Sequence, residues 1–369
     1  MFPLLNRNVP HLGPKDLVTA AFVCKEWYAA TGEKEGKAVL LKAVATGCEH
    51  LVAYILEDQH INVNEHWICS LSCVNAIWGM TRDGAALSCS VLYDGNCALL
   101  VAVMSRKEDM VKLLLKRDDI EVNVMNKLGQ SALMVAVMNS NEEIVKLLLG
   151  RDDIEVNVIN KHQKSALMVA VMNSNEEILK LLLGRKDIDV NAADKHGYSA
   201  LASIAMLNEK EQIVNLLLGR KDIHVNSINE YGQCALMVAT IHEKQPIVKL
   251  LLKRKDIDAN AVDKDGDSAL MIAVMNGNEE IVQLLLGRED IEVNATDSSG
   301  RTSLMIAVKE GRVRITECLL QNPSIDINVK DDYGRTAENY TNDVMMAGDK
   351  EKIRKLFEKR GARGSSMDA

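Results

Sequence analysis

The sequence is poor in aromatic residues and contains no long apolar run. Aromatic side chains make up 4% of its 369 residues, so a core must be built from Leu, Val, Ile, Ala and Met. The longest apolar runs, such as residues 97–104, are far too short to cross a bilayer. Residues 1–10 lack the apolar stretch of a secretory signal, and neither end carries a lipidation motif. We therefore expect an intracellular, cytoplasmic protein with no membrane partner.

An excess of positive charge is also missing. The chain has 44 Lys and Arg against 52 Asp and Glu, a net charge of −8, which argues against a nucleic acid as partner. Its eight cysteines are scattered in aliphatic sequence, which is typical of reduced thiols. A zinc knuckle would need a close Cys-x-x-Cys pair, and this spacing is absent from His66, Cys69, Cys73, Cys89 and Cys97. We expect no metal and no cofactor.

Sequence motifs of catalysis are missing as well. There is no phosphate loop, no dinucleotide-binding glycine pattern, no His-Glu-x-x-His and no nucleophile elbow. The paired acids Asp118-Asp119 and Asp152-Asp153 follow helical segments, and we expect them to form solvated ion pairs with the adjacent Arg117 and Arg151 that contribute little. The sequence predicts a protein that is not an enzyme.

What the sequence does contain is a repeat with a period of 34 residues. The string Ser-Ala-Leu-Met-Val-Ala at 131–136 returns at 165–170, which indicates stacked supersecondary units. Each unit reads as an Asn/Asp-x-x-Gly turn, a Ser, Thr or Cys cap, a short helix of small residues and a second, amphipathic helix. No unit could bury its apolar side alone, so the units must stack. An Asn closes each unit: Asn123, Asn157, Asn191, Asn226, Asn260, Asn294 and Asn328.

This pattern resembles the ankyrin repeat. The Thr-Pro-Leu-His-x-Ala of that family corresponds here to residues 131–136 and 302–307, with Met in place of His. That exchange removes the hydrogen bonds that the family's His makes between repeats and substitutes thioether packing. The resemblance covers roughly residues 36–360 and implies an all-α fold, an α-solenoid of helix-turn-helix repeats with β-hairpin-like turn tips.

The repeats divide the chain into six predicted segments. Residues 91–329 hold seven repeats, and residues 330–360 form a capping repeat with a strongly charged last helix. The remaining segments are an F-box-like remnant or cap at 1–35, a first degenerate unit at 36–64, an irregular insertion or decayed repeat at 65–90, and a disordered tail at 361–369.

The first segment is similar to the second half of an F-box. The matching positions are Leu12, Asp16, Leu17, Val23, Cys24, Lys25 and Trp27. This resemblance implies docking to a ubiquitin-ligase adaptor, although the opening of the motif is absent. The alternative is a plain amphipathic helix that caps the array, and the sequence leaves both open.

The resemblance to ankyrin arrays also places a partner-binding concave face along the first helices and the turn tips. Flexible apolar side chains recur there beside polar ones, and such a stripe favours an interaction site. The expected contact residues are Met104, Met138, Asn139, Met172, Asn173, Leu207, Asn208, Ile241, His242, Met275, Asn276 and Lys309. The turn tips vary more, as specificity requires: Lys127, Lys161, His162, Lys195, His196, Tyr231 and Asp265.

The apolar stripe also has two alternative origins. Its side chains could pack against the neighbouring turn, or duplication could have copied the methionines without selection. The sequence favours a monomeric, non-catalytic scaffold that binds a protein partner. The alternative function is a substrate-recognition subunit of a cullin-type ubiquitin ligase.

Overall fold

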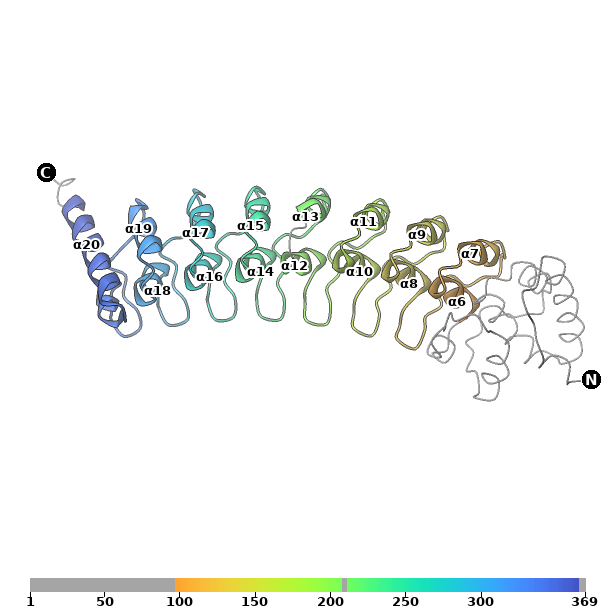
Figure 1. Ribbon diagram of the computed structural model, residues 1–369, viewed down its shortest axis with the longest axis horizontal. Helices are drawn as coiled ribbons and strands as arrows, with labels where there is room; N and C mark the ends of the chain where they lie inside the picture. The colour runs from red at the N-terminus through yellow and green to blue at the C-terminus, as the bar shows by residue number, and fades with distance from the viewer. Residues whose placement is uncertain (1–96, 208–210, 365–369) are drawn as a thin grey trace, which may run out of the picture. The chain divides into compact units, whose positions relative to one another are not determined.

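The computed structural model describes residues 97–207 and 211–364, which fall into two compact units (Figure 1). Unit 1 comprises Met1–Ile188 and unit 2 comprises Asp189–Ala369. The described residues contain 15 α-helices and one 3-10 helix. Their extended segments form only isolated β-bridges. The predicted all-α class of stacked helix-turn-helix repeats is thereby confirmed. The predicted segments 1–35, 36–64 and 65–90 lie outside the described residues.

Three helix pairs make up the described part of unit 1 (Figure 1). The first helix of each pair lies in an inner layer beside the turns, and the second lies in an outer layer. Each inner helix contacts its neighbour, α6 with α8 and α8 with α10, and the outer helices do the same. The bounds are α6 Ala98–Met104, α7 Glu108–Leu114, α8 Ala132–Met138, α9 Glu142–Leu149, α10 Ala166–Asn173 and α11 Glu176–Leu183.

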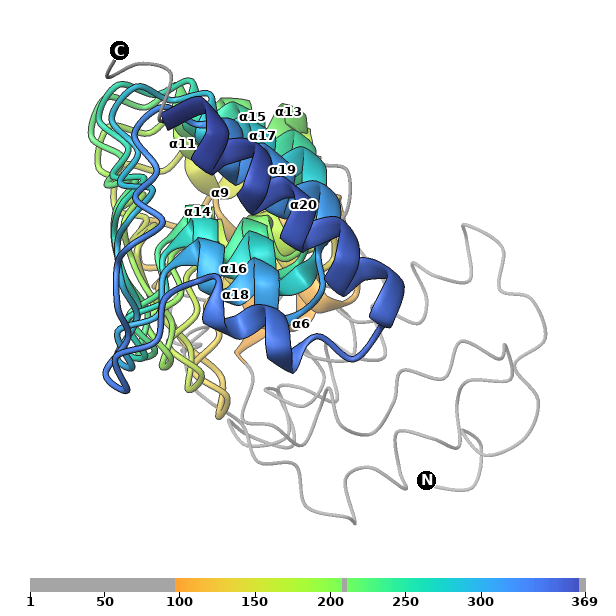
Figure 2. The same cartoon turned by 90° about the vertical axis from the view of Figure 1, so that its left-hand side faces the viewer.

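Unit 2 repeats this arrangement and ends in a longer helix. Its inner helices are α12 Ala200–Ala205, α14 Ala235–Ile241, α16 Ala269–Asn276 and α18 Ser303–Lys309. Its outer helices are α13 Glu211–Leu218, α15 Gln245–Leu252, α17 Glu279–Leu286 and α19 Val313–Gln321. The 3-10 helix η1, Asn339–Asp343, and α20, Ala347–Gly364, complete the unit. Figure 2 shows α20 across the end of the unit, where it contacts α19.

The predicted caps explain where the helices begin. The hydroxyl of Ser131 accepts the backbone N–H of Met134 at 3.3 Å, and the side-chain oxygen of Asn141 accepts that of Ile144 at 3.1 Å. Cys97 and Cys234 occupy the same position in α6 and α14, as predicted, but make no side-chain cap. Both thiols are buried, and burial raises their pKa.

The inner helices are buried almost all round. In α8 every residue from Ala132 to Val137 is buried, including Met134 at the position of the family's His. The outer helix α9 buries only Ile144, Val145 and Leu148, and its remaining side chains are wholly or partly exposed. The small residues of the inner layer allow close packing, and burial of this apolar surface supplies the main stabilising free energy.

Six of the closing Asn residues, from Asn123 to Asn294, each tie one repeat to the next. Asn123 donates its Nδ2 hydrogen to the carbonyl oxygen of Asp153 at 2.7 Å, and its Oδ1 accepts the N–H of Glu155 at 2.8 Å. In unit 2, Asn226, Asn260 and Asn294 make the same two bonds. A side chain that satisfies a backbone donor and acceptor about 30 residues away explains why this Asn recurs.

The Arg–Asp pairs after the outer helices are more than solvated charges, contrary to the expectation from sequence. Arg254 binds Asp256 with two parallel bonds, Nε to Oδ1 at 2.8 Å and Nη2 to Oδ2 at 2.7 Å. Its Nη1 also donates to the carbonyl oxygen of Leu218 in the preceding repeat at 2.9 Å. Arg151, Arg185 and Arg288 repeat this geometry. The guanidinium therefore links two repeats and satisfies a carbonyl at a helix end.

The last helix extends further than predicted. We expected the capping repeat to end at residue 360 and a disordered tail to begin at 361, but α20 continues to Gly364. Ile353 and Phe357 are buried and anchor the helix, while most of its charged side chains are exposed. Residues 365–369 lie outside the described residues.

Candidate functional site

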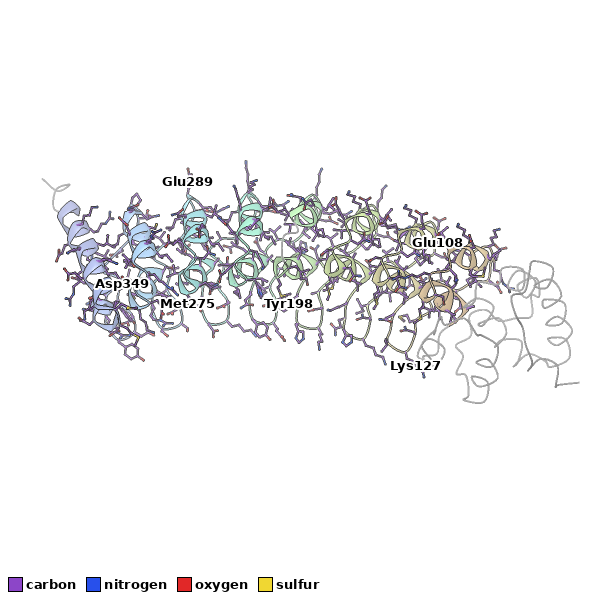
Figure 3. The ribbon with its side chains drawn as sticks, viewed as in Figure 1. Glu108, Lys127, Tyr198, Met275, Glu289 and Asp349 are labelled. Carbon is purple, nitrogen blue, oxygen red and sulfur yellow. The ribbon has the colours of Figure 1, made fainter. Side chains whose placement is uncertain are left out.

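The predicted apolar column lies at the ends of the inner helices, beside the turns. Met138 is 46% exposed and Met172 is 47% exposed. The equivalent Met104, Ile241 and Met275 are half-buried, and the last of the column, Lys309, is exposed. The label of Met275 in Figure 3 marks this position in unit 2.

One member of this column was predicted one residue too late. Counted from the capping Ser199, the residue that corresponds to Met138 is Met206, which follows the short helix α12. Leu207 comes next in the chain, and both side chains are half-buried. This repeat is one residue longer than the repeats before it, and the extra residue follows Met206, so counting from the capping Ser199 gives the correct position. Asn208 lies outside the described residues.

A polar side chain from the turn lies against Met138 and against Met172. The Nε2 of Gln130 is 3.2 Å from the Sδ of Met138, and the Nζ of Lys164 is 3.2 Å from the Sδ of Met172. Each thioether therefore has a hydrogen-bond donor at its edge. A ligand that packs on the methionine would also meet the amide or the ammonium group.

The polar column next to the methionines also has a role within the array. The amide of Asn139 donates to the carbonyl oxygen of Val103 at 3.3 Å, and that of Asn173 donates to the carbonyl of Met138 at 3.2 Å. Asn276 makes the equivalent bonds to Thr240 and Ile241. These amides satisfy free carbonyls at the end of the preceding inner helix. His242, at the same position, is exposed.

The predicted turn-tip residues are all exposed, and their backbones join neighbouring turns. The N–H of Lys161 donates to the carbonyl of Leu128 at 3.1 Å, and that of Lys264 donates to the carbonyl of Tyr231 at 3.1 Å. The remaining predicted tips, exposed in the same way, are Lys127, His162, Lys195, His196 and Asp265. His196 also contacts Glu230 of the next turn, Nδ1 to Oε1 at 2.7 Å. Within each unit the tips thus form a connected edge.

The sequence reasoning missed a second set of exposed apolar residues, which stand directly before the turns. Met125 is 45% exposed, Ile159 49%, Ile228 60% and Val262 49%. In the sequence they look like core residues. Each stands two residues after a closing Asn, and no regular alternation of polar and apolar residues marks it as exposed. The signal that could have found them is their fixed place one residue before the turn Asn or Asp.

One turn of unit 2 carries an unpaired carboxylate. The side chain four residues after the turn Asn or Asp bonds back to it in other turns: Gln130 to Asn126, Gln233 to Asn229 and Arg301 to Asp297. Asp267 instead lies near Asp263, and its buried Oδ1 has no hydrogen-bond partner. Burial and the charges of Asp263 and Asp297 raise the pKa of Asp267 to about 6, an effect that Arg301 partly offsets.

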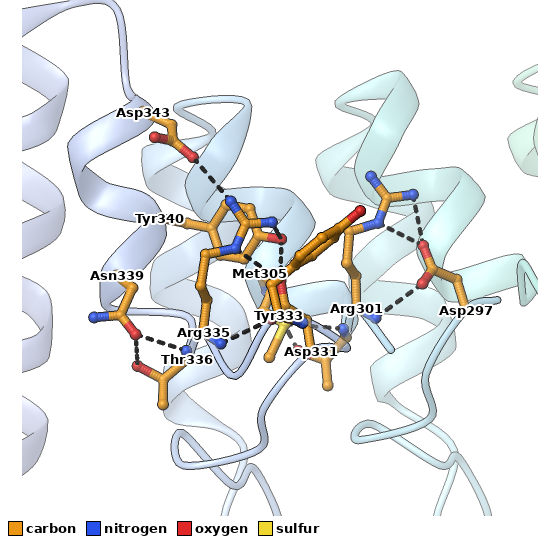
Figure 4. Close-up of polar contacts among 11 residues, drawn as sticks. Asp297, Arg301, Met305, Asp331, Tyr333, Arg335, Thr336, Asn339, Tyr340 and Asp343 are labelled. Carbon is orange, nitrogen blue, oxygen red and sulfur yellow. Dashed lines mark hydrogen bonds and ion pairs between the residues drawn. The ribbon is translucent and has the colours of Figure 1, made fainter. Parts of the chain in front are cut away.

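The last turn is held by a polar network around Asp331 (Figure 4). The hydroxyl of the buried Tyr340 donates to Asp331 Oδ2 at 2.7 Å, and Arg335 Nε donates to the same oxygen at 2.9 Å. Arg335 also lies over the rings of Tyr340 and Tyr333, at 4.2 and 5.2 Å from their centroids. Burial would raise the pKa of Asp331, but the bonds from Tyr340 and Arg335 outweigh it and lower this pKa to about 2.

Neither a metal cluster nor a membrane span occurs among the described residues. Within 97–207 and 211–364, no group of three or more His, Cys, Asp or Glu side chains has a metal-binding arrangement. Of the five residues considered for zinc, only Cys97 is described. No helix in the described part of the chain has both the length and the apolar character needed to span a membrane. The F-box-like residues Leu12, Asp16, Leu17, Val23, Cys24 and Trp27 lie outside the described residues.

Comparison with known proteins adds a family and two similar structures. The family model "Ankyrin repeats (3 copies)" matches residues 66–160, 99–194, 167–263 and 236–331. The first match includes most of the segment that we expected to be an insertion or a decayed repeat. None of the curated proteins compared with the chain matches it.

Two of the similar solved structures are ankyrin proteins. The crystal structure of the ankyrin repeat domain of Bcl-3, described as a unique member of the IkappaB protein family, has a TM-score of 0.56 and 27% identity. The match covers 61% of this chain and 99% of that one. The crystal structure of EF0377, an ankyrin repeat protein, has a TM-score of 0.48 and 26% identity, with 56% and 98% covered.

Proposed function

The chain belongs to the ankyrin-repeat family, and from this premise we propose that it is a non-catalytic scaffold that binds a partner protein through its turns and inner-helix ends. Ankyrin repeats are in general modules of protein–protein interaction. The observation that carries the proposal is the exposure of large apolar side chains on this side of the array, above all Met138 and Met172. Exposed apolar stripes with adaptable thioethers are typical of interaction surfaces.

Geometry supports this surface over others. The turns are joined tip to tip by backbone bonds, as between Leu128 and Lys161, so the side chains at the tips stand on a fixed frame. A rigid frame with variable side chains lowers the entropy cost of binding and allows specificity. The outer helices offer ion-paired, solvated surface instead, as in the pair of Lys180 with Glu176 and Glu177. We propose that the chain acts as a monomer, which light scattering tests.

The test is proximity labelling in cells with the intact chain and with the double variant Met138→Glu, Met172→Glu. A buried charge in the contact should abolish labelling of a specific partner, while circular dichroism and thermal unfolding stay unchanged. The matched control is Lys116→Gln, Lys186→Gln, which changes the net charge equally at exposed positions away from the turns. Unchanged partners in a folded Met variant would contradict the proposal.

A second candidate function rests on the F-box-like segment alone. Val23, Cys24 and Trp27 match that motif, and docking to a ubiquitin-ligase adaptor would make the repeats a substrate receptor. The test is a pull-down of the adaptor with the full chain and with Trp27→Ala. Capture that depends on Trp27 supports this function, and its absence removes it.

A further inference from the structure

Acidic residues in the described part of unit 1 are confined to the outer helices and the loops that follow them. No Asp or Glu occurs in residues 122–141 or 156–175, the two segments that contain the closing Asn, the turn and the inner helix. The charged side chains of these segments are Lys127, Lys161 and Lys164. Figure 3 shows the two sides: Lys127 at a turn tip and Glu108 in the outer layer. In a chain of net charge −8, these two segments are locally basic.

The exposed large apolar side chains in the described part of unit 1 lie on the side of the turns and inner helices, where acidic residues are absent. Among residues 97–188, the large hydrophobic side chains that are exposed are Met125, Leu128, Met138, Ile159 and Met172. All five stand in the turns or at the ends of inner helices. We call these five residues together with Lys127, Lys161 and Lys164 the basic-apolar face of unit 1.

The two kinds of side chain are interleaved within this face. The Nζ of Lys164 lies 3.2 Å from the Sδ of Met172, and Leu128 at one tip accepts the N–H of Lys161 at the next. A ligand group in contact with Met172 is therefore within reach of the Lys164 ammonium group, and the backbone bond places the side chains of Leu128 and Lys161 on adjoining tips. Apolar contact would supply affinity, and charge would supply specificity and a faster association.

From this segregation we infer that the basic-apolar face of unit 1 binds an acidic protein segment with large apolar side chains. The inference rests on the proposed function and names the chemistry of its partner. Carboxylates of the segment pair with Lys127, Lys161 and Lys164, while its apolar side chains pack on Met138, Met172 and Ile159. A basic segment would be repelled, because no acid on this face could receive it.

A nucleic acid fits the same face less well. Residues 122–141 and 156–175 contain no Phe, Tyr or Trp on which bases could stack. Three lysines also neutralise few phosphates. The exposed Leu, Ile and Met side chains have no counterpart on a phosphate backbone.

The experiment is selection of random 16-residue peptides displayed on phage against the intact chain, followed by anisotropy measurements with the selected peptides. We expect peptides rich in Asp and Glu with Leu, Phe or Met. The triple variant Lys127→Gln, Lys161→Gln, Lys164→Gln should weaken their binding roughly tenfold. The matched variant Lys112→Gln, Lys116→Gln, Lys186→Gln removes the same charge from the outer side and should leave binding unchanged.

The outcomes separate this inference from the proposed function. Neutral or basic peptides that need Met138 and Met172 would overturn the acidic-segment inference and leave the scaffold proposal standing. Peptides that bind independently of both the lysines and the methionines, or the absence of selected peptides, would overturn both. A single-stranded 20-nucleotide DNA that binds as tightly as the selected peptides at 150 mM salt would also overturn the inference.

Discussion

Asp267 lies near Asp263 in the turn before α16, and its buried Oδ1 has no hydrogen-bond partner. The Oδ1 of Asp263 is already used, since it accepts the backbone N–H of Asp267 at 3.0 Å. The corresponding residues of the next two turns form the ion pairs Asp297–Arg301 and Asp331–Arg335. This turn therefore keeps a local repulsion that its neighbours have replaced with attraction.

We predict that Asp267→Asn stabilises the chain at neutral pH. An amide can donate to Asp263 and carries no charge, so unfolding should cost about 1 kcal/mol more, after allowance for the solvent screening of a partly exposed group. The pKa of Asp267 is raised from 3.8 to about 6 by burial and neighbouring acids. The folded state therefore binds the proton of Asp267 more tightly than the unfolded state does. As pH rises from about 4 to about 6, this proton is lost, and the free energy of unfolding of the wild type decreases.

Urea unfolding at pH 4, 5, 6 and 7 checks this. The advantage of Asp267→Asn should grow with pH and level off above about 6. The control Glu289→Gln removes an exposed carboxylate of unit 2 and should give a small, constant difference. A pH-independent gain in Asp267→Asn would contradict the repulsion.

A second prediction concerns the turn position that is Gly in most repeats. Gln163 occupies it with φ +57°, whereas Gly129 has φ +73°. A left-handed conformation costs a residue with a Cβ roughly 1 kcal/mol, so Gln163→Gly should raise the unfolding free energy by up to about that amount. The reverse exchange, Gly129→Gln, should destabilise the chain more strongly, because its Cβ would lie 3.1 Å from the backbone N of Lys161. Equal urea midpoints for the two variants would refute this account.

A third prediction tests the Arg that links two repeats. Arg254→Lys keeps the charge but cannot hold Asp256 with two bonds and the carbonyl of Leu218 with a third. We expect a loss of about 1 kcal/mol in chemical unfolding, against no measurable change for Lys255→Arg at the exposed neighbour. Wild-type stability in Arg254→Lys would mean that the pair is only a solvated contact, as the sequence alone predicts.

A fourth prediction concerns the network of the last turn. Tyr340→Phe removes the hydroxyl that donates a hydrogen bond to Asp331. The buried carboxylate then lacks this donor, which should lower the free energy of unfolding by about 1–3 kcal/mol. Burial and the bond to Asp331 raise the pKa of Tyr340 to about 12. The stability from this bond is therefore complete below pH 10 and is lost as pH rises towards 12.

Absorbance titration of the tyrosines, with Tyr340→Phe as reference, should show one phenol that ionises last. The control for stability is Tyr333→Phe at a residue that is 80% exposed, and this change should alter stability by less than about 0.5 kcal/mol. An unperturbed titration in the wild type would exclude the network.

The fold could be predicted from the sequence because it depends on local signals that recur. Ser131 and Ser165 mark helix starts, the closing Asn residues set the period, and the alternation of small and amphipathic helices specifies the two layers. Contacts between repeats could not be predicted in this way. The hydrogen bond from Arg185 to Leu149 and the one from Asn139 to Val103 join residues that are 36 apart in the sequence. No sequence pattern within one repeat predicts them.

The candidate site was only partly predictable for the same reason. Met138 and Met172 follow from periodicity, but their exposure depends on what the next repeat covers. Ile159 and Ile228 were missed because an apolar residue next to the turn is equally compatible with a core position. Met206 lies as far after the capping Ser199 as Met138 lies after Ser131, so this member of the column could have been found from the capping signal.

The inner helices α8 and α10 share the sequence Ala-Leu-Met-Val-Ala-Val-Met, and each is followed by Asn-Ser-Asn-Glu-Glu. A ligand seated on Met138 would thus find a nearly identical seat one repeat further on, at Met172. Two such binding positions lie side by side, and their turns differ at four places: Met125 against Ile159, Leu128 against His162, Gly129 against Gln163 and Gln130 against Lys164. A short partner could therefore move from one of these positions to the other without dissociating, which would lengthen its residence time on the protein. A partner long enough to occupy both positions would bind in a single register.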